Sequence, residues 1–122
     1  MAVKLNQRGF DHARKLVESG RFVADERDDW SDDQPSAAQE NAFIEEHGWD
    51  EFGRWHLAID SDATPETKGH YKFPYGDFAK VHRCALLAAE SRAGQRKYAD
   101  VQNAATQLHG MLDGAAAGRS RR

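Results

Sequence analysis

Two alanine-rich segments near the C-terminus place the strongest constraint on the fold. Residues 77–94 and 100–113 both carry apolar side chains at helical spacing. Only the short link 95–98 separates the two patterns, so the helices are expected to pack against each other as an antiparallel hairpin. Asp77 is expected to cap the first helix and Asp100 the second. The first pattern is apolar on most sides, which is typical of a central helix.

The composition favours one small domain. The chain has 122 residues, which leaves no room for a second core. Only 20 of them are Leu, Ile, Val or Phe, whereas 19 are alanine. Such a composition indicates a thin helical core accompanied by flexible segments. We therefore expect a single domain over residues 1–113 and a disordered basic tail over residues 114–122.

Two further helices are predicted in the N-terminal half, at residues 6–20 and 35–48. Asn6 is placed to cap the first of them. The second begins with a capping box, in which Ser36 and Gln39 each bond a backbone N–H group of the other. Four helices are therefore expected in all.

Strand signals are confined to one region. Leu57 and Ile59 alternate with their neighbours as in a strand, and residues 71–73 can return as a second strand after the loop at 61–70. At most one short two-stranded β element is therefore expected. The predicted fold class is mainly α, with α+β as the alternative.

Charge is distributed unevenly along the chain, although the net charge is only −3. Residues 24–66 hold 14 acidic groups and two basic ones, whereas residues 67–122 hold ten basic and four acidic groups. Segregated charge favours attraction between the two parts or to a charged partner. The predicted function is a small non-enzymatic binding or regulatory module that acts through these surfaces, with a protein as its partner.

The acidic surface is densest at residues 24–34, which show no helical or alternating pattern. Like charges repel one another there, so a flexible, extended loop is expected. Trp30 is the exception, and it either docks on the domain or remains free for a partner. The candidate docking residues are Asp25, Glu26, Asp28, Asp29, Trp30, Asp32 and Asp33.

The alternative function is nucleic-acid binding by the basic C-terminal half. Cations there would contact phosphates, and aromatic side chains between them would stack on bases. The candidate contact residues are Lys72, Lys80, Arg83, Arg92, Arg96 and Lys97, and the aromatic residues among them are Tyr71, Phe73, Tyr75 and Tyr98.

Residues 57–64 contain the pattern D-x-D-x-T after an apolar run. This pattern resembles the nucleophile motif of haloacid-dehalogenase-like phosphotransferases. The resemblance implies a metal-dependent phosphate-chemistry enzyme in which Asp60 attacks phosphate and Asp62 acts as acid and base, with Mg²⁺ balancing the charge. Too few strands follow to build the parallel sheet of that fold. Because Asp, Ser, Thr and Pro are also ordinary turn residues, the turn interpretation is favoured.

His70, Asp77, His82 and Cys84 are donor types found in metal and nucleophilic sites. In the helix predicted at 77–94, however, His82 and Cys84 are two residues apart and point in different directions. Cys84 among apolar neighbours is typical of a small buried hydrophobe. The histidine spacings in the chain match no metal-binding signature. No metal, cofactor or catalytic residue is therefore predicted.

The C-terminal half resembles a helical-hairpin module of small uncharacterised bacterial and phage-associated proteins. The resemblance covers residues 70–113 and implies an extended, proline-containing segment that leads into the hairpin. It implies no reaction. The matching residues are Lys72, Phe73, Pro74, Asp77, Ala85, Ala89, Arg92, Ala93 and Gln95.

Location is inferred from apolar runs and cysteine content. No apolar run follows the N-terminal Met-Ala-Val-Lys, and no segment approaches the roughly 18 apolar residues that span a bilayer. The single cysteine excludes an internal disulfide and a cysteine-rich zinc site. A cytoplasmic protein without a membrane partner is therefore expected.

Overall fold

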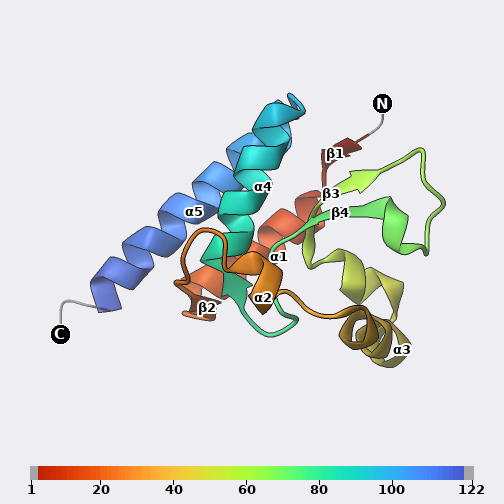
Figure 1. Cartoon of the computed structure of the whole chain (residues 1–122), viewed down its shortest axis with the longest axis horizontal. Coiled ribbons are helices and arrows are strands. Elements are labelled where there is room, and N and C mark those ends of the chain that lie inside the picture. Colours follow the sequence, from red (N-terminus) through yellow and green to blue (C-terminus); the bar gives the residue numbers. More distant parts are fainter. Residues whose placement is uncertain (1–2, 120–122) are drawn as a thin grey trace.

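A computed structural model of the chain describes residues 3–119 (Figure 1). The helices are α1 (Gln7–Glu18), α2 (Trp30–Asp33), α3 (Ala37–Gly53), α4 (Arg83–Gln95) and α5 (Ala99–Arg119), with a 3₁₀ turn, η1 (Lys68–His70). The strands are β1 (Val3–Leu5), β2 (Phe22–Val23), β3 (His56–Asp60), β4 (Tyr71–Pro74) and β5 (Val81–His82). The fold is therefore mainly α with some β. None of the described helices is long and apolar enough to cross a membrane.

α4 and α5 form a helical hairpin and lie side by side (Figure 1). α5 continues to Arg119, beyond the predicted end at residue 113. Residues 114–119 are therefore helical, and residues 120–122 of the expected tail lie outside the described residues. α5 buries an apolar stripe that consists of Val101, Ala104, Ala105, Leu108 and Leu112.

β1, β3 and β4 form an antiparallel sheet with β3 in the centre. Ala58 of β3 lies opposite Leu5 on one side and Lys72 on the other. The pair β3–β4 is the predicted hairpin. The prediction of at most one two-stranded element is nevertheless wrong, because β1 adds a third strand and β2 pairs with β5. β1 has only three residues, which are too few to show an alternating pattern.

β2 and β5 form a separate parallel pair, in which Phe22 lies opposite Val81 and Val23 opposite His82. Phe22 and Val81 are both buried in the core. Because the strands run in the same direction, the chain that follows β2 emerges beside the chain that follows β5. Segment 24–34 is thereby carried to the N-terminal end of α4.

The helix predicted at residues 77–94 begins later, at Arg83. Asp77 does not cap it. Its Oδ1 atom instead accepts hydrogen bonds from the backbone N–H groups of Ala79 at 2.9 Å and Lys80 at 2.7 Å. Aspartate side chains compete with helix formation by closing local turns of this kind. Val81 then joins the β2–β5 pair, so that the helix starts only after it.

Segment 24–34 is not an extended loop throughout, because Trp30–Asp33 form α2, a fifth helix. Trp30 docks on the domain, and the centroid of its ring lies 5.6 Å from that of His82. The predicted repulsion among the carboxylates of this segment is offset where Asp25 and Asp33 face His82.

The caps predicted for the two helices of the N-terminal half, at Asn6 and Ser36, differ in outcome. The capping box of α3 is confirmed, since Ser36 Oγ accepts the N–H of Gln39 at 3.1 Å and Gln39 Oε1 accepts the N–H of Ser36 at 2.8 Å. Asn6 occupies the N-cap position of α1 without a side-chain capping bond. Its amide donates instead to the backbone oxygens of Gly53 and His56, which ties α1 to the end of α3 and to β3.

We expect Gly9→Ala to lower the free energy of unfolding by about 1–3 kcal/mol, because α1 crosses β3 at close range. A Cβ atom on Gly9 would overlap the backbone oxygen of His56. Gly110→Ala is the matched control, because a Cβ there meets no atom within 4 Å and alanine favours a helix. Thermal melting of the two variants checks this, and equal melting temperatures would contradict it.

Candidate functional site

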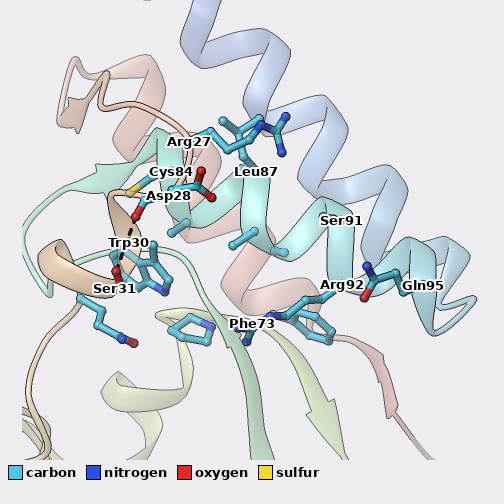
Figure 2. Close-up of a pocket in the computed structure, with 15 residues that line it drawn as sticks. Arg27, Asp28, Trp30, Ser31, Phe73, Cys84, Leu87, Ser91, Arg92 and Gln95 are labelled. Atoms are coloured by element: carbon cyan, nitrogen blue, oxygen red, sulfur yellow. Dashed lines mark hydrogen bonds between the residues drawn. The ribbon is translucent and has the colours of Figure 1, made fainter.

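A cleft of about 530 Å³ lies between α2 and α4 (Figure 2). Arg27 and Trp30 line it on the side of segment 24–34, and Arg92 lines it on α4. Phe73 and Pro74 of β4 also contribute to the lining. The cleft is therefore built from parts of the chain that are far apart in sequence.

A second cleft, of about 510 Å³, adjoins the first. Four residues line both clefts: Phe73, Pro74, Arg92 and Gln95. The two clefts therefore meet at these residues, and together we call them the α4 groove. In its second half the groove is lined by Lys72, Arg96 and Tyr98, among others.

Of the six predicted basic contact residues, three line the α4 groove and three do not. Lys72, Arg92 and Arg96 line the α4 groove. Arg83 is engaged elsewhere, because its Nε atom donates to Asp113 at 2.7 Å. The remaining two, Lys80 and Lys97, are exposed and are not part of the lining of either cleft.

The aromatic residues divide in the same way. Trp30, Phe73 and Tyr98 line the groove and are half-buried. Tyr75 is fully buried, and its hydroxyl donates to a backbone oxygen at 2.6 Å. Tyr71 packs in an aromatic cluster with Trp49 and others, at 6.2 Å between ring centroids. Three half-buried rings therefore line the groove.

The predicted acidic docking residues also separate. Asp25, Trp30 and Asp33 turn toward His82. Asp29 accepts the backbone N–H of Glu26 at 2.9 Å, which closes a turn. Asp28 lines the first cleft, and Asp32 and Glu26 are exposed.

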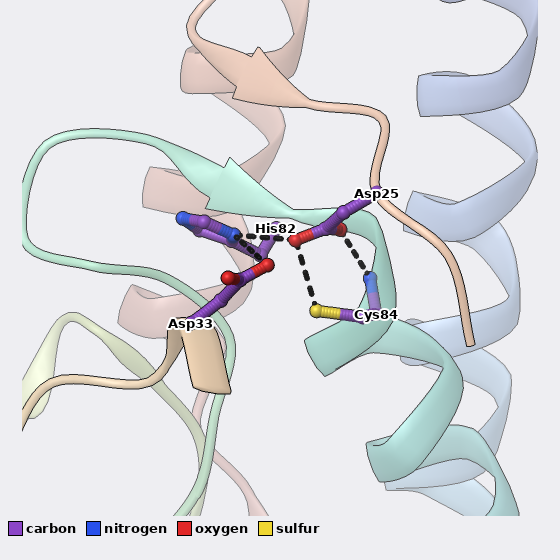
Figure 3. A group of neighbouring side chains, drawn as sticks. All are labelled: Asp25, Asp33, His82 and Cys84. Carbon is purple, nitrogen blue, oxygen red and sulfur yellow. Dashed lines mark hydrogen bonds and ion pairs between the residues drawn. The ribbon is translucent and has the colours of Figure 1, made fainter. Parts of the chain in front are cut away.

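His82 lies between two carboxylates, those of Asp25 and Asp77 (Figure 3 shows Asp25). Its Nδ1 atom is 2.7 Å from Asp25 Oδ2, and its Nε2 atom is 2.7 Å from Asp77 Oδ2. Its side chain is only 7% exposed. Burial opposes the charged form, but the hydrogen bonds to Asp77 and Asp25 outweigh it and raise the pKa of His82. The imidazolium form donates to both carboxylates.

Asp25 connects His82 to Cys84. Its Oδ1 atom accepts the backbone N–H of Cys84 at 2.8 Å, and its Oδ2 atom lies 3.0 Å from Cys84 Sγ. Burial raises the pKa of Asp25, but hydrogen bonds with Asp33, Cys84 and His82 lower it to about 2. Burial and the neighbouring Asp25 carboxylate raise the pKa of Cys84, which keeps it a thiol.

Asp33, at the end of α2, completes a cluster of four side chains (Figure 3). Its Oδ2 atom lies 3.8 Å from His82 Nδ1, and its hydrogen bond with Asp25 raises the pKa of Asp33. One donor atom from each of Asp25, Asp33, His82 and Cys84 lies within 4.8 Å of the other three. Thiol, imidazole and carboxylate are the side chains that bind transition-metal ions in proteins. We call these four residues the His82 cluster.

Sequence reasoning missed the His82 cluster because it placed His82 and Cys84 in one helix. His82 is instead extended, with φ −105° and ψ 127°, whereas Cys84 is the second residue of α4. The change of backbone conformation between them turns both side chains toward Asp25. The one local signal was the β-branched Val81 after the Asp77 turn, which favours a strand.

A second histidine between carboxylates lies on the α4–α5 face. His109 Nδ1 is 3.1 Å from Glu90 Oε2, and His109 Nε2 is 3.0 Å from Asp113 Oδ2. Asp113 also accepts from Arg83, whose Nη1 atom donates to the backbone oxygen of Asp25 at 3.4 Å. This network joins the hairpin to segment 24–34.

Asp60 and Asp62 form an ordinary turn after β3. Asp60 Oδ1 accepts the backbone N–H of Asp62 at 3.0 Å, and Asp62 is exposed. Asp60 is paired with Val3 in the sheet and lines the second cleft. This arrangement favours the turn interpretation over a phosphate-transfer site.

Comparison of the chain with protein-family models, with curated proteins and with solved structures found no match. The resemblance of residues 70–113 to a helical-hairpin module stays a prediction.

Proposed function

We propose that this protein is a small non-enzymatic binding module whose ligand is an extended, anionic chain lying in the α4 groove. The observation that carries the proposal is the composition of the groove. Four cationic residues line it, Arg27, Lys72, Arg92 and Arg96, against two acidic ones, Asp28 and Asp60. A depression that concentrates one sign of charge attracts ligands of the opposite sign.

Arg92 is the central cation of the proposed site, since it lines both clefts. A guanidinium group binds carboxylates and phosphates through paired hydrogen bonds. Phe73 lies at the same junction, and its φ of 60° is unusual for a non-glycine residue. Strained backbone is concentrated at binding sites, which is consistent with a ligand at this position.

The first candidate ligand is an acidic segment of a protein partner. Ala85, Leu87 and Ala88 of α4 add small apolar groups to the lining of the first cleft. A peptide that alternates acidic and apolar side chains would place carboxylates on the arginines and apolar groups on this surface.

The second candidate ligand is a single-stranded nucleic acid. Trp30, Phe73 and Tyr98 favour it, because they distribute three aromatic rings along a groove that also holds cations. Rings and cations in alternation bind single strands without sequence preference, through base stacking and phosphate contacts.

Titration with two labelled probes tests the proposal and separates the candidates. The probes are a peptide of alternating glutamate and phenylalanine and an oligothymidine strand. We expect one of them to bind, and its affinity to fall steeply between low and physiological salt because the contacts are ionic. Salt-independent binding, or no binding of either probe at low salt, would contradict the proposal.

Charge reversal locates the site. We expect Arg92→Glu to weaken binding of that probe at least tenfold, because a charge-assisted hydrogen bond contributes about 1.5–3 kcal/mol. Lys15→Glu is the control, since Lys15 is an exposed cation of α1 that lines neither cleft. Equal losses in the two variants would show that binding depends on net charge alone.

A further inference from the structure

We propose that the His82 cluster is a binding site for a thiophilic divalent cation of the Zn²⁺ type. The site uses Asp25, Asp33, His82 and Cys84 as its four ligands. This site and the ligand of the α4 groove are separate proposals, and each can be tested without the other.

Of three donor separations in the His82 cluster, one matches tetrahedral coordination and two are shorter than it requires. With bonds of about 2.0–2.3 Å to a central Zn²⁺, neighbouring donor atoms are about 3.3–3.8 Å apart. Asp25 Oδ2 lies 2.7 Å from His82 Nδ1 and 3.0 Å from Cys84 Sγ, and Asp33 Oδ2 lies 3.8 Å from the same Nδ1 atom. The Asp25 carboxylate must therefore move away from His82 and Cys84 by less than about 1 Å to make room for an ion.

Asp77 supplies a second observation, which lies outside the four ligands. It accepts a hydrogen bond from His82 Nε2 at 2.7 Å, and two backbone N–H groups hold its other oxygen. A metal-binding histidine almost always donates its second N–H to such a carboxylate, which fixes the ring and directs the other nitrogen to the metal. The nitrogen left for the metal is Nδ1, which in this structure is hydrogen-bonded to Asp25 and lies 3.8 Å from Asp33.

The donor set selects the class of ion. A thiolate and an imidazole beside two carboxylates suit Zn²⁺ or Co²⁺, whereas Mg²⁺ and Ca²⁺ prefer oxygen ligands alone. Four protein ligands complete a tetrahedron, which is typical of a structural rather than a catalytic zinc site. An ion can enter from the side of Asp33, whose side chain is 36% exposed, and Cys84 borders the first cleft.

Binding replaces protons by the metal ion. Cys84 Sγ and His82 Nδ1 now hold protons that they share with Asp25, and both must leave when the ion binds. The ion would then join segment 24–34, which supplies the two aspartates, to the β5–α4 junction, which supplies the histidine and the cysteine. Its role is to fix the wall of the groove that carries Arg27 and Trp30.

Co²⁺ titration of the metal-stripped full chain under reducing conditions tests the site. We expect saturation at one ion per chain, with the visible bands of tetrahedral Co²⁺ and a thiolate-to-cobalt charge-transfer band. Zn²⁺ should displace Co²⁺, and excess Mg²⁺ or Ca²⁺ should not. A wild-type spectrum without the charge-transfer band would overturn the proposal and leave the cluster as a hydrogen-bonded contact only.

Three variants assign the ligands by competition with a Zn²⁺ indicator. Cys84→Ser should remove the charge-transfer band and weaken Zn²⁺ binding at least a hundredfold. Asp77→Asn should weaken it about tenfold while the band remains, because Asp77 positions His82 without touching the ion. Asp32→Asn, an exposed carboxylate of the same segment, should change nothing. Equal Zn²⁺ affinity of Cys84→Ser and wild type would refute the site. If a variant does not fold, the wild-type Co²⁺ spectrum alone tests the proposal.

Discussion

Asp25→Ala is expected to lower the free energy of unfolding by about 3–5 kcal/mol in metal-free protein. The Asp25 side chain is only 8% exposed, and it accepts hydrogen bonds from His82, from the Cys84 thiol and from the Cys84 backbone. Alanine would leave the imidazolium without one of its two carboxylates and a backbone N–H without an acceptor. Both losses are costly at a buried site. Because a domain of this size is stabilised by about 5–15 kcal/mol, this is a large fraction of the total.

Urea unfolding in the presence of a chelator measures this loss, because the chelator separates the hydrogen-bonded contact from metal binding. Asp32→Ala is the matched control: Asp32 is an exposed aspartate of the same segment 24–34, and its loss is expected to cost less than about 0.5 kcal/mol. Asp25→Asn should fall between the two, since its amide oxygen can still accept the Cys84 N–H. Similar unfolding curves for Asp25→Ala and Asp32→Ala would show that segment 24–34 does not depend on Asp25.

The helical hairpin could be predicted because the sequence patterns that specify its helices involve only residues close together in the chain. The stripe of α5, from Val101 to Leu112, repeats at helical spacing and is buried as expected. The capping box of Ser36 and Gln39 is likewise contained within four residues. Patterns of this kind depend on neighbours in sequence, and no distant contact is required to interpret them.

The His82 cluster could not be predicted because its geometry depends on two strands of two residues each. β2 and β5 are too short for any periodicity, and their pairing joins residues 59 positions apart. Without that pairing, the sequence from Asp77 to Gln95 resembles one continuous helix. In such a helix His82 and Cys84 diverge, whereas in the fold both reach Asp25.

The sequence predicts which residues are charged, but it does not predict which of them lie together on one surface. Arg92 and Arg96 line the groove, as the predicted basic face requires. Arg83 instead donates a hydrogen bond to Asp113. A sequence shows which residues are charged and leaves open which of them neutralise one another within the fold. The acidic segment illustrates the same point, because Asp25 and Asp33 face His82 within the fold.

Segment 24–34 links the two proposals. Asp25 and Asp33 of this segment belong to the His82 cluster, and Arg27 and Trp30 between them line the α4 groove. The position of the groove wall therefore depends on the contacts of the cluster. A chain with so few large apolar residues gains stability from such polar contacts.

His56 is expected to make the fold sensitive to mild acid. It is 4% exposed, its ring packs on those of Phe52 and Tyr71, and its Nδ1–H donates to the backbone oxygen of Phe52 at 2.9 Å. Burial lowers the pKa of His56 from 6.5 to about 4, although the hydrogen bond to Phe52 opposes this shift. The folded state therefore holds the neutral form, and the unfolded chain takes up the proton first as the pH falls. Stability is fully present above pH 6.5 and decreases as the pH falls to about 4, by about 3 kcal/mol in total.

Urea unfolding of wild type and His56→Asn at a series of pH values from 7.5 to about 4 isolates this contribution. Asparagine keeps a donor near the position of Nδ1 and does not titrate, so the variant should be less stable at neutral pH and lose less stability on acidification. The difference between the two curves should shrink by about 3 kcal/mol across the range. Asp25 does not interfere, because its lowered pKa of about 2 means that its contribution is lost only below pH 3.8. Parallel curves for the two proteins would mean that His56 is already accessible to protons in the folded state.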